Sequence, residues 1–157
     1  MKPRPDNPQV HIRQLTYLRA LSTEPRIHIV KGQFLSHEKY MRLAKPYKNR
    51  KYAQVLVTEE KGSDVNIATW LMFDASRGHF DTAVVISNDS NLVSPIKFVT
   101  KVYGKMIGLI FPSQKPSNQL REYATFIKQI RTGVLGVCQF PSQMKDSKGQ
   151  FHKPSDW

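Results

Sequence analysis

The sequence predicts an α/β protein in which helices pack against a mostly parallel sheet. Short apolar or β-branched runs alternate with segments of helical periodicity, and the inner runs are almost continuously apolar. Continuous apolar character is typical of strands covered on both faces, and alternation with helices is typical of parallel strands joined by crossovers. The 157 residues suffice for one domain with a core of its own.

The N-terminal part of the chain is expected to form a helix and then a strand. Residues 11–21 (HIRQLTYLRAL) place apolar side chains at helical spacing, and Pro25 follows closely enough to end that helix. Residues 26–34 (RIHIVKGQF) then alternate apolar and polar side chains, as a strand with one buried face does.

A basic segment separates this strand from a second one. Residues 36–51 are polar and basic, and Pro46 should break any helical turn that forms within them. Residues 52–58 (YAQVLVT) are rich in β-branched side chains, which favour strands. We therefore expect an irregular connection followed by a strand.

The middle of the chain predicts a helix followed by a buried strand. Gly62 ends the extended segment, Ser63 is suited to cap a helix, and Asp64 falls in its first turn. Gly78 closes the helix, and residues 82–87 (TAVVIS) form a nearly all-apolar strand that should be covered on both faces. The stripe that this helix should bury comprises Val65, Ala68, Leu71, Met72 and Ala75.

The C-terminal half continues the alternation. Residues 88–91 (NDSN) predict a turn into another helix, and residues 106–111 (MIGLIF) predict a further buried strand. Residues 118–131 have the periodicity of an amphipathic helix. Residues 132–157 hold glycine, proline and scattered aromatic side chains and are expected to form an extended tail packed on the domain. The predicted organisation is one domain over residues 1–131 followed by this tail.

The charge distribution points to a polyanionic partner. The formal net charge is +12 and the pI is about 10.0. Residues 1–58 hold twelve Lys/Arg and three acids, residues 59–91 hold two and six, and residues 92–157 hold ten and three. An acidic island therefore lies between two basic stretches, and clustered carboxylates repel one another unless separation or a cation relieves them.

The acidic island maps to one edge of the predicted sheet. Glu59 and Glu60 follow one predicted strand, Asp89 follows the next, and Asp64 opens the helix between them. Chemistry in such sheets gathers at the carboxyl ends of the strands, so these side chains should converge there with Asn91. Converging carboxylates hold Mg²⁺ or Mn²⁺, which favour oxygen ligands. Two other interpretations stay open: Asp64 would suit a helix start through the dipole alone, and Asp89 would suit a capped turn.

At these residues the sequence resembles a known family. Residues 59–66 (EEKGSDVN), followed by residues 83–90 (AVVISNDS), resemble the NYN domain family, a PIN-like group of ribonucleases. The spacing of the two blocks also matches, and residues 138–141 (CQFP) and 153–157 (KPSDW) are similar to the tail of bacterial members. The resemblance extends over nearly the whole chain.

This resemblance implies a fold, a cofactor and an activity. The fold would be a Rossmann-like (PIN-like) three-layer sandwich with a mostly parallel sheet. The activity would be cleavage of RNA phosphodiesters by metal-activated water, without a covalent intermediate and with Mg²⁺ or Mn²⁺ as cofactor. Asp64 and Asp89 match the second and third acidic positions of the family, and Asn66 matches a polar position beside the site. The predicted catalytic residues are Asp64, Asp89 and Asn91, and the predicted metal ligands are Asp64, Asp89 and Glu60.

The predicted contacts to nucleic acid come from cations around this edge and from the basic segment. Tyrosines lie among the cations of residues 39–52, which suits base stacking beside phosphate contacts, although a basic run is also often only a solvated face. The predicted nucleic-acid-binding residues are Lys48, Arg50, Lys51, Lys61, Asn66 and Lys97.

The chain departs from the family pattern at two positions. Asn91 stands where the family usually has Asp, and no strand ending in an Asp-Gly-x-Asn-like motif precedes residue 26. We therefore expect a domain that is N-terminally truncated relative to the family, and a homodimer in which a partner chain covers the exposed sheet. Two functions stay open: an active metal-dependent ribonuclease, or a catalytically impaired remnant that binds nucleic acid or a protein partner.

Other classes of protein find little support. No apolar run approaches the roughly 20 residues of a membrane helix, and residues 1–8 lack the apolar core of a signal peptide. The lone Cys138 excludes an internal disulfide framework and suits the cytoplasm, which is the predicted location. The five histidines have no metal-ligand spacing, and the chain has neither a P-loop nor a Gly-x-Ser-x-Gly motif.

Overall fold

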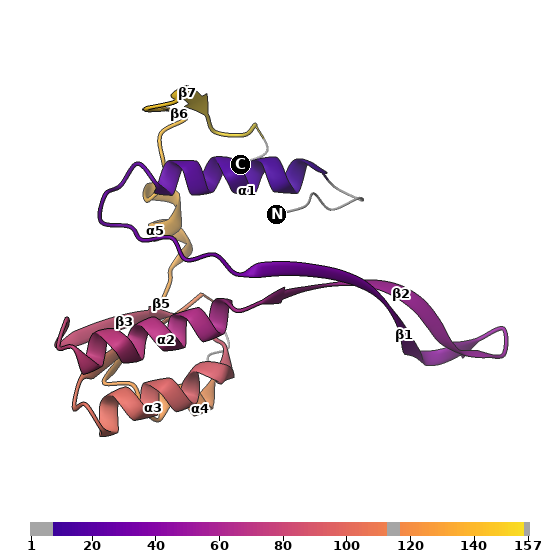
Figure 1. Cartoon of the computed structure of the whole chain (residues 1–157), viewed down its shortest axis with the longest axis horizontal. Coiled ribbons are helices and arrows are strands. Elements are labelled where there is room, and N and C mark those ends of the chain that lie inside the picture. The colour runs from indigo at the N-terminus through magenta and orange to yellow at the C-terminus, as the bar shows by residue number, and fades with distance from the viewer. Residues whose placement is uncertain (1–7, 113–116, 156–157) are drawn as a thin grey trace.

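The computed structural model describes residues 8–112 and 117–155, which form an α/β unit, a long β-ribbon and a helix packed with the C-terminal segment (Figure 1). The elements follow in the order α1 (Pro8–Leu21), β1 (Gln33–Tyr47), β2 (Arg50–Lys61), α2 (Ser63–Ser76), β3 (Thr82–Ile86), the 3₁₀ turn η1 (Ser90–Leu92), α3 (Val93–Lys101), β4 (Met106–Phe111), α4 (Asn118–Arg121), β5 (Phe126–Gln129), α5 (Thr132–Val137), β6 (Gln143–Asp146) and β7 (Gly149–His152).

The structure confirms the predicted α/β class, with one parallel three-stranded sheet and two antiparallel two-stranded sheets among the described residues. Strands β3, β4 and β5 form a parallel three-stranded sheet in that order, and α2, α3 and α4 pack beside it (Figure 1). Alternate residues of β4 point into the core, because successive side chains of a strand face opposite sides. The buried core contains Leu71, Ala75, Val85, Leu92, Ile96, Val99, Ile107, Leu109, Phe111 and Leu120. The sequence placed Val65 in the buried stripe of α2, but its side chain is 62% exposed, so that prediction is wrong.

The opposite face of this sheet is open. Val84 and Ile86 of β3 are 50% and 60% exposed, and Met106 of β4 is 47% exposed. The prediction that residues 82–87 are covered on both faces is therefore wrong for the described part of the chain. β3 is also an edge strand with β4 as its only neighbour among the described strands. The helices of the described residues thus supply one layer beside the sheet, and the second helical layer of the predicted sandwich is not among them.

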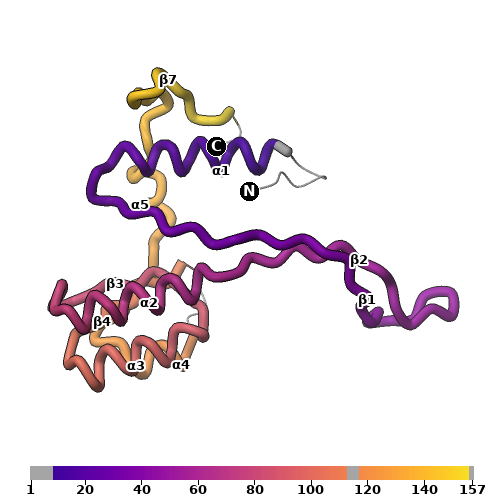
Figure 2. The backbone as a smooth tube through the Cα atoms, in the orientation of Figure 1, coloured from indigo at the N-terminus to yellow at the C-terminus, as the bar shows by residue number. Residues whose placement is uncertain are grey.

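Strands β1 and β2 form a two-stranded antiparallel ribbon that projects away from the α/β unit (Figure 2). Lys48 and Asn49 join the strands with φ values of 45° and 62°, as a two-residue type I′ turn requires. Strand β2 confirms the strand expected over residues 52–58. The strand expected over residues 26–34 is wrong, because β1 begins only at Gln33.

The basic segment 36–51 also differs from its prediction, because it forms most of the ribbon instead of an irregular connection. Pro46 lies where the register shifts between Arg42 and Tyr47. Proline has no N–H to donate to the ladder and is tolerated at such irregularities. Both faces of a two-stranded ribbon are wet, so its polar side chains carry no apolar alternation by which a strand could be recognised.

Helix α1 confirms the helix expected over residues 11–21, and it packs against the C-terminal segment. Arg19 donates two hydrogen bonds to the carboxylate of Asp146, with Nε and Nη2 at 2.7 and 2.6 Å from the two oxygens. Its guanidinium also lies 4.2 Å from the ring centroid of Phe151. The ring of Tyr17 packs edge-on against Phe140 at 6.1 Å between centroids. These contacts tie the hairpin β6–β7 to α1.

The helix expected over residues 118–131 is wrong beyond its first turn. Helix α4 ends at Arg121, and residues 126–129 form β5, which pairs with β4. The amide of Thr125 donates to the carbonyl of Ile107 at 2.7 Å, which starts this pairing. In residues 132–157, where an extended course was expected, the structure has the short helix α5 and the hairpin β6–β7. No helix in residues 8–112 or 117–155 is long and apolar enough to cross a bilayer.

Candidate acidic site

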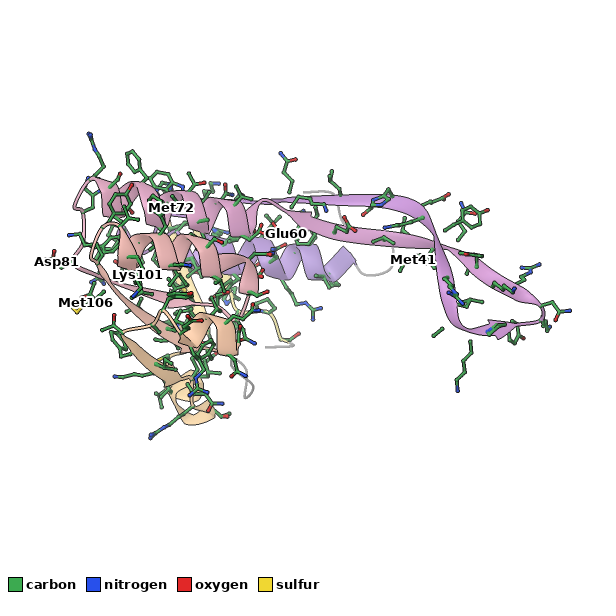
Figure 3. The ribbon with its side chains drawn as sticks, turned by 90° about the horizontal axis from the view of Figure 1, so that it is seen from below. Met41, Glu60, Met72, Asp81, Lys101 and Met106 are labelled. Carbon is green, nitrogen blue, oxygen red and sulfur yellow. The ribbon has the colours of Figure 1, made fainter. Side chains whose placement is uncertain are left out.

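An open pocket of about 290 Å³ lies where β2 meets α2 and where β3 ends. It brings together Glu60, Asp64, Asp89 and Asn91, four of the five polar residues that the sequence placed at this sheet edge, whereas the fifth, Glu59, is not among its lining residues. Its remaining lining residues are Ser63, Ile67, Ser87 and Leu92. Figure 3 shows Glu60 at the junction between the ribbon and the α/β unit.

The start of α2 positions Asp64. Gly62 occupies the N-cap position with φ 93°, a left-handed conformation that glycine adopts without steric cost. The cap is therefore one residue earlier than the sequence predicted, and Ser63 is the first helical residue. Asp64 lies in the first turn, where the helix dipole favours its negative charge. Its Oδ2 accepts a hydrogen bond from Nδ2 of Asn91 at 3.3 Å.

The end of β3 positions Asp89 and Asn91. Oδ1 of Asp89 accepts from the amide of Asn91 at 2.9 Å, which caps η1. The amide of Asp89 in turn donates to Oγ of Ser87 at 3.1 Å. The capping role left open for Asp89 is therefore present in the structure. This cap uses only Oδ1 of Asp89. Both oxygens of a carboxylate can accept hydrogen bonds or bind a cation, so the cap does not use the full capacity of the group.

Glu60 is held by the residue that opens α2. Its Oε1 accepts hydrogen bonds from the amide of Ser63 at 3.2 Å and from Oγ of Ser63 at 2.6 Å. Gly32 passes so close that a Cβ at this position would collide with Oε1 of Glu60, with Oγ of Ser63 and with the carbonyl of Lys61. Only glycine lets the backbone pass here without moving the carboxylate.

The pocket carboxylates form no ion pair among the described residues, although the charge of Asp64 contributes to raising the pKa of the nearby Lys61. Lys61 pairs with Glu59 instead, with Nζ 2.7 Å from Oε2, and the hydrogen bond from Lys61 lowers the pKa of Glu59 and raises that of Lys61. None of the ion pairs formed within the described part of the chain involves Glu60, Asp64 or Asp89. Residues 8–112 and 117–155 contain no group of three or more His, Cys, Asp or Glu side chains close enough together to hold a metal ion.

The other predicted site residues do not line the pocket. Asn66 donates from Nδ2 to the carbonyl of Lys31 at 3.4 Å, so it fastens α2 to the entering chain. The Nζ of Lys97 on α3 lies 5.6 Å from the ring centroid of Tyr123. Lys48, Arg50 and Lys51 lie at or next to the turn that joins β1 to β2, and none of them lines the pocket.

Sequence reasoning missed three residues of this site. Ser87 and Ser63 carry hydroxyl groups that hold the backbone of Asp89 and the carboxylate of Glu60, but each was interpreted as an ordinary strand end or helix cap. Their position directly beside the acidic motifs was the signal that would have found them. Gly32 left no signal, because its role depends on a contact between segments far apart in the sequence.

Comparison with known proteins settles the family. The family model described as the NYN domain matches residues 9–135. The chain belongs to the NYN domain family. The predicted resemblance is thereby confirmed, and with it membership of a PIN-like, nuclease-related group that suggests nucleic-acid binding.

Two individual proteins are similar to this NYN domain. The 6-hydroxy-3-succinoylpyridine 3-monooxygenase HspA of Pseudomonas putida is 26% identical over 97% of this chain. The chain spans only 52% of the length of HspA, so the activity in that name belongs to a protein about twice as long. A crystal structure of a protein of unknown function from Vibrio parahaemolyticus is 14% identical and has a TM-score of 0.48, covering 84% of this chain and 65% of that protein.

Proposed function

We propose that this NYN domain is a metal-dependent ribonuclease whose centre is the pocket of Glu60, Asp64, Asp89 and Asn91. The observation that carries the proposal is that three carboxylates and one amide line one open pocket, while none of the ion pairs among the described residues is made to Glu60, Asp64 or Asp89. Like charges cost free energy when they gather, and a divalent cation bound by oxygen ligands would offset that cost.

The residues present suit such a cation through the chemistry of their donors. Asp64 and Asp89 would hold it, and the side-chain oxygen of Asn91 would be available because its Nδ2 already donates to Asp64. Glu60 is fixed by Ser63 and is suited to orient a water or to accept its proton. A bound Mg²⁺ or Mn²⁺ would supply phosphate neutralisation and a lowered pKa for water.

A cleavage assay with matched variants tests this centre. RNA would be incubated with Mg²⁺ or Mn²⁺ and with wild type, Asp89→Ala or Asp81→Ala. Asp81 is a suitable control because it is 96% exposed and precedes β3, at the opposite end of the strand from the pocket. We expect Asp89→Ala to lose activity by roughly 100-fold or more and Asp81→Ala to keep it. Unchanged cleavage by Asp89→Ala would rule out the assignment.

The alternative is an impaired nuclease that still binds nucleic acid. It is favoured by Asn91, which brings no charge to the pocket, and by the lack of a ready-made three-ligand group among the described residues. Asn91→Asp distinguishes the two functions. Cleavage that appears only in this variant would establish the remnant, whereas cleavage by wild type would exclude it.

We further propose that two copies of the chain pair through the open sheet face. The exposed face of β3 and β4 supplies apolar surface for such an interface. Sedimentation showing a compact monomer at micromolar concentration would contradict the pairing.

A further inference from the structure

The ribbon β1–β2 has a strongly basic outer part. Residues 39–52 contain six lysines and arginines and no aspartate or glutamate, whereas Glu59 and Glu60 lie at the base of the ribbon beside the acidic pocket. All six cations are exposed. They are Lys39, Arg42, Lys45, Lys48, Arg50 and Lys51. The ribbon therefore leads from the acidic pocket to a region of uniform positive charge.

Aromatic rings share this outer part with the cations. Arg42 pairs with Tyr52 across the ribbon, and Tyr40 lies two residues before Arg42, so all three side chains project from the same face. The side chains of Tyr40 and Tyr52 are 71% and 59% exposed. At the tip, Tyr47 is 65% exposed, and Nζ of Lys48 lies 5.4 Å from its ring centroid.

Protection of an exposed strand does not account for this composition. Charged side chains on exposed strands, lysine especially, hinder edge-to-edge aggregation, but that purpose gives no reason for aromatic rings between the cations. Exposed tyrosine rings work against it, because they present apolar surface to other molecules. Cations without any acid, interleaved with open aromatic rings, match a strand of nucleotides, whose phosphates are anionic and whose bases stack on aromatic side chains.

We propose that residues 39–52 form an arm that holds a single-stranded segment of RNA while the adjoining part of the same strand occupies the acidic pocket. The choice of RNA rests on the proposed ribonuclease function, whereas single-stranded character follows from the open tyrosine rings. The twelve residues from Glu60 back to Lys48 span about 40 Å at strand spacing. The arm therefore favours long substrates, and an RNA that fills only the pocket gains nothing from it.

Binding measurements separate the arm from the catalytic centre. Fluorescence anisotropy would follow a labelled single-stranded RNA of roughly 20 nucleotides, and a second of roughly 4, in EDTA without added metal so that neither is cleaved. The arm variant is Lys48→Glu, Arg50→Glu, Lys51→Glu. The matched control is Lys101→Glu, Lys145→Glu, Lys148→Glu, which changes the net charge equally on α3 and the C-terminal hairpin.

The expected results follow from the two kinds of contact. The arm variant should bind the long RNA at least tenfold more weakly, and the slope of log K against log salt should fall by about 2, since three phosphate contacts on a single strand are lost. Tyr40→Ala, Tyr52→Ala should weaken binding by about tenfold or more without changing that slope. The charge control should bind the long RNA with nearly the affinity of wild type. The affinity for the short RNA should be nearly the same for wild type and the arm variant.

Several outcomes would contradict the proposal that residues 39–52 bind RNA. One is an arm variant that binds like wild type or no more weakly than the charge control. Another is a preference for a hairpin of the same length over the single strand. A third is an arm variant that changes the sedimentation coefficient and leaves RNA binding intact, since this would assign the ribbon to a protein interface. If the arm variant loses RNA binding while wild type cleaves no RNA with either metal, the result supports the arm and contradicts the ribonuclease function.

Discussion

At the scale of single residues, the pocket depends on side chains that serve the fold and the site together. Asp89 lines the pocket and caps η1, since its Oδ1 accepts a hydrogen bond from the amide of Asn91. The side chain of Asn91 in turn donates to Asp64. A substitution here would therefore change local folding together with the proposed binding of a metal ion. Experiments must separate the two by measuring stability with and without a divalent ion.

Asn91→Asp should make the stability of the domain depend on metal. The substitution replaces the amide that donates to Asp64, at 3.3 Å, with a like charge, and such a pair repels unless a cation lies between. We expect a lower melting temperature in EDTA than for wild type and a larger gain with Mg²⁺ or Mn²⁺. Thermal unfolding with and without each ion measures this. An equal metal response in Asn91→Asp and wild type would contradict it, and Asn118→Asp at the start of α4 provides the control.

Gly32→Ala should disturb the same pocket from a different direction. The new methyl group would collide with Glu60 and with the carbonyl of Lys61, so the backbone must shift as well as a side chain. We expect a loss of roughly 1–3 kcal/mol in the free energy of unfolding, together with weaker cleavage if Glu60 acts there. Urea denaturation measures the first effect. Gly133→Ala, where a Cβ meets open space, should leave stability unchanged or slightly raised, and an equal loss in both variants would contradict the explanation.

At the scale of elements, the attachment of the C-terminal hairpin to α1 should be sensitive to acid. The hydrogen bonds from Arg19 lower the pKa of Asp146 from 3.8 to about 2. Because the folded-state pKa is the lower one, the carboxylate stabilises the docked hairpin above pH 3.8, and this stabilisation is lost as the pH falls through that value toward 2. The protection of residues 143–152 against hydrogen exchange, measured relative to the intrinsic exchange rate at each pH, should therefore fall across this range.

Asp146→Asn provides the matching control for this titration. The variant should exchange faster at neutral pH and show no further step between pH 4 and 2, because the titrating group is gone. A step of the same size in the variant would assign the acid sensitivity to another carboxylate.

The elements also show what the sequence can predict. The site edge was predictable, because residues that follow β3 and residues that open α2 must meet at the carboxyl ends of parallel strands. Strand β5 was not, because Leu120, Ala124 and Ile127 fit a helical period equally well, and only pairing with β4 decides the outcome. Most of strand β1 was missed because a strand without a buried face has no apolar alternation to detect.

At the scale of the whole molecule, the exposed face of the sheet β3–β4–β5 leaves apolar side chains in contact with water. Val84 and Ile86 lie half exposed on a parallel strand, a position that such sheets normally bury. Among the described strands β3 pairs only with β4, so its other edge is available to a further strand. A second copy that covers this face would remove apolar surface from water in both chains, so folding and association would be linked.

This linkage predicts a melting temperature that rises with protein concentration. Association stabilises the folded chain by mass action, whereas the unfolding of a monomer does not depend on concentration. Scanning calorimetry over a hundredfold range of concentration would measure the rise. Ile86→Glu should abolish it, because a buried carboxylate on the paired face costs several kcal/mol. Glu introduced at Val137, which is 83% exposed on α5, should not. A melting temperature independent of concentration for wild type would mean that the open face is stable in water and that the chain functions alone.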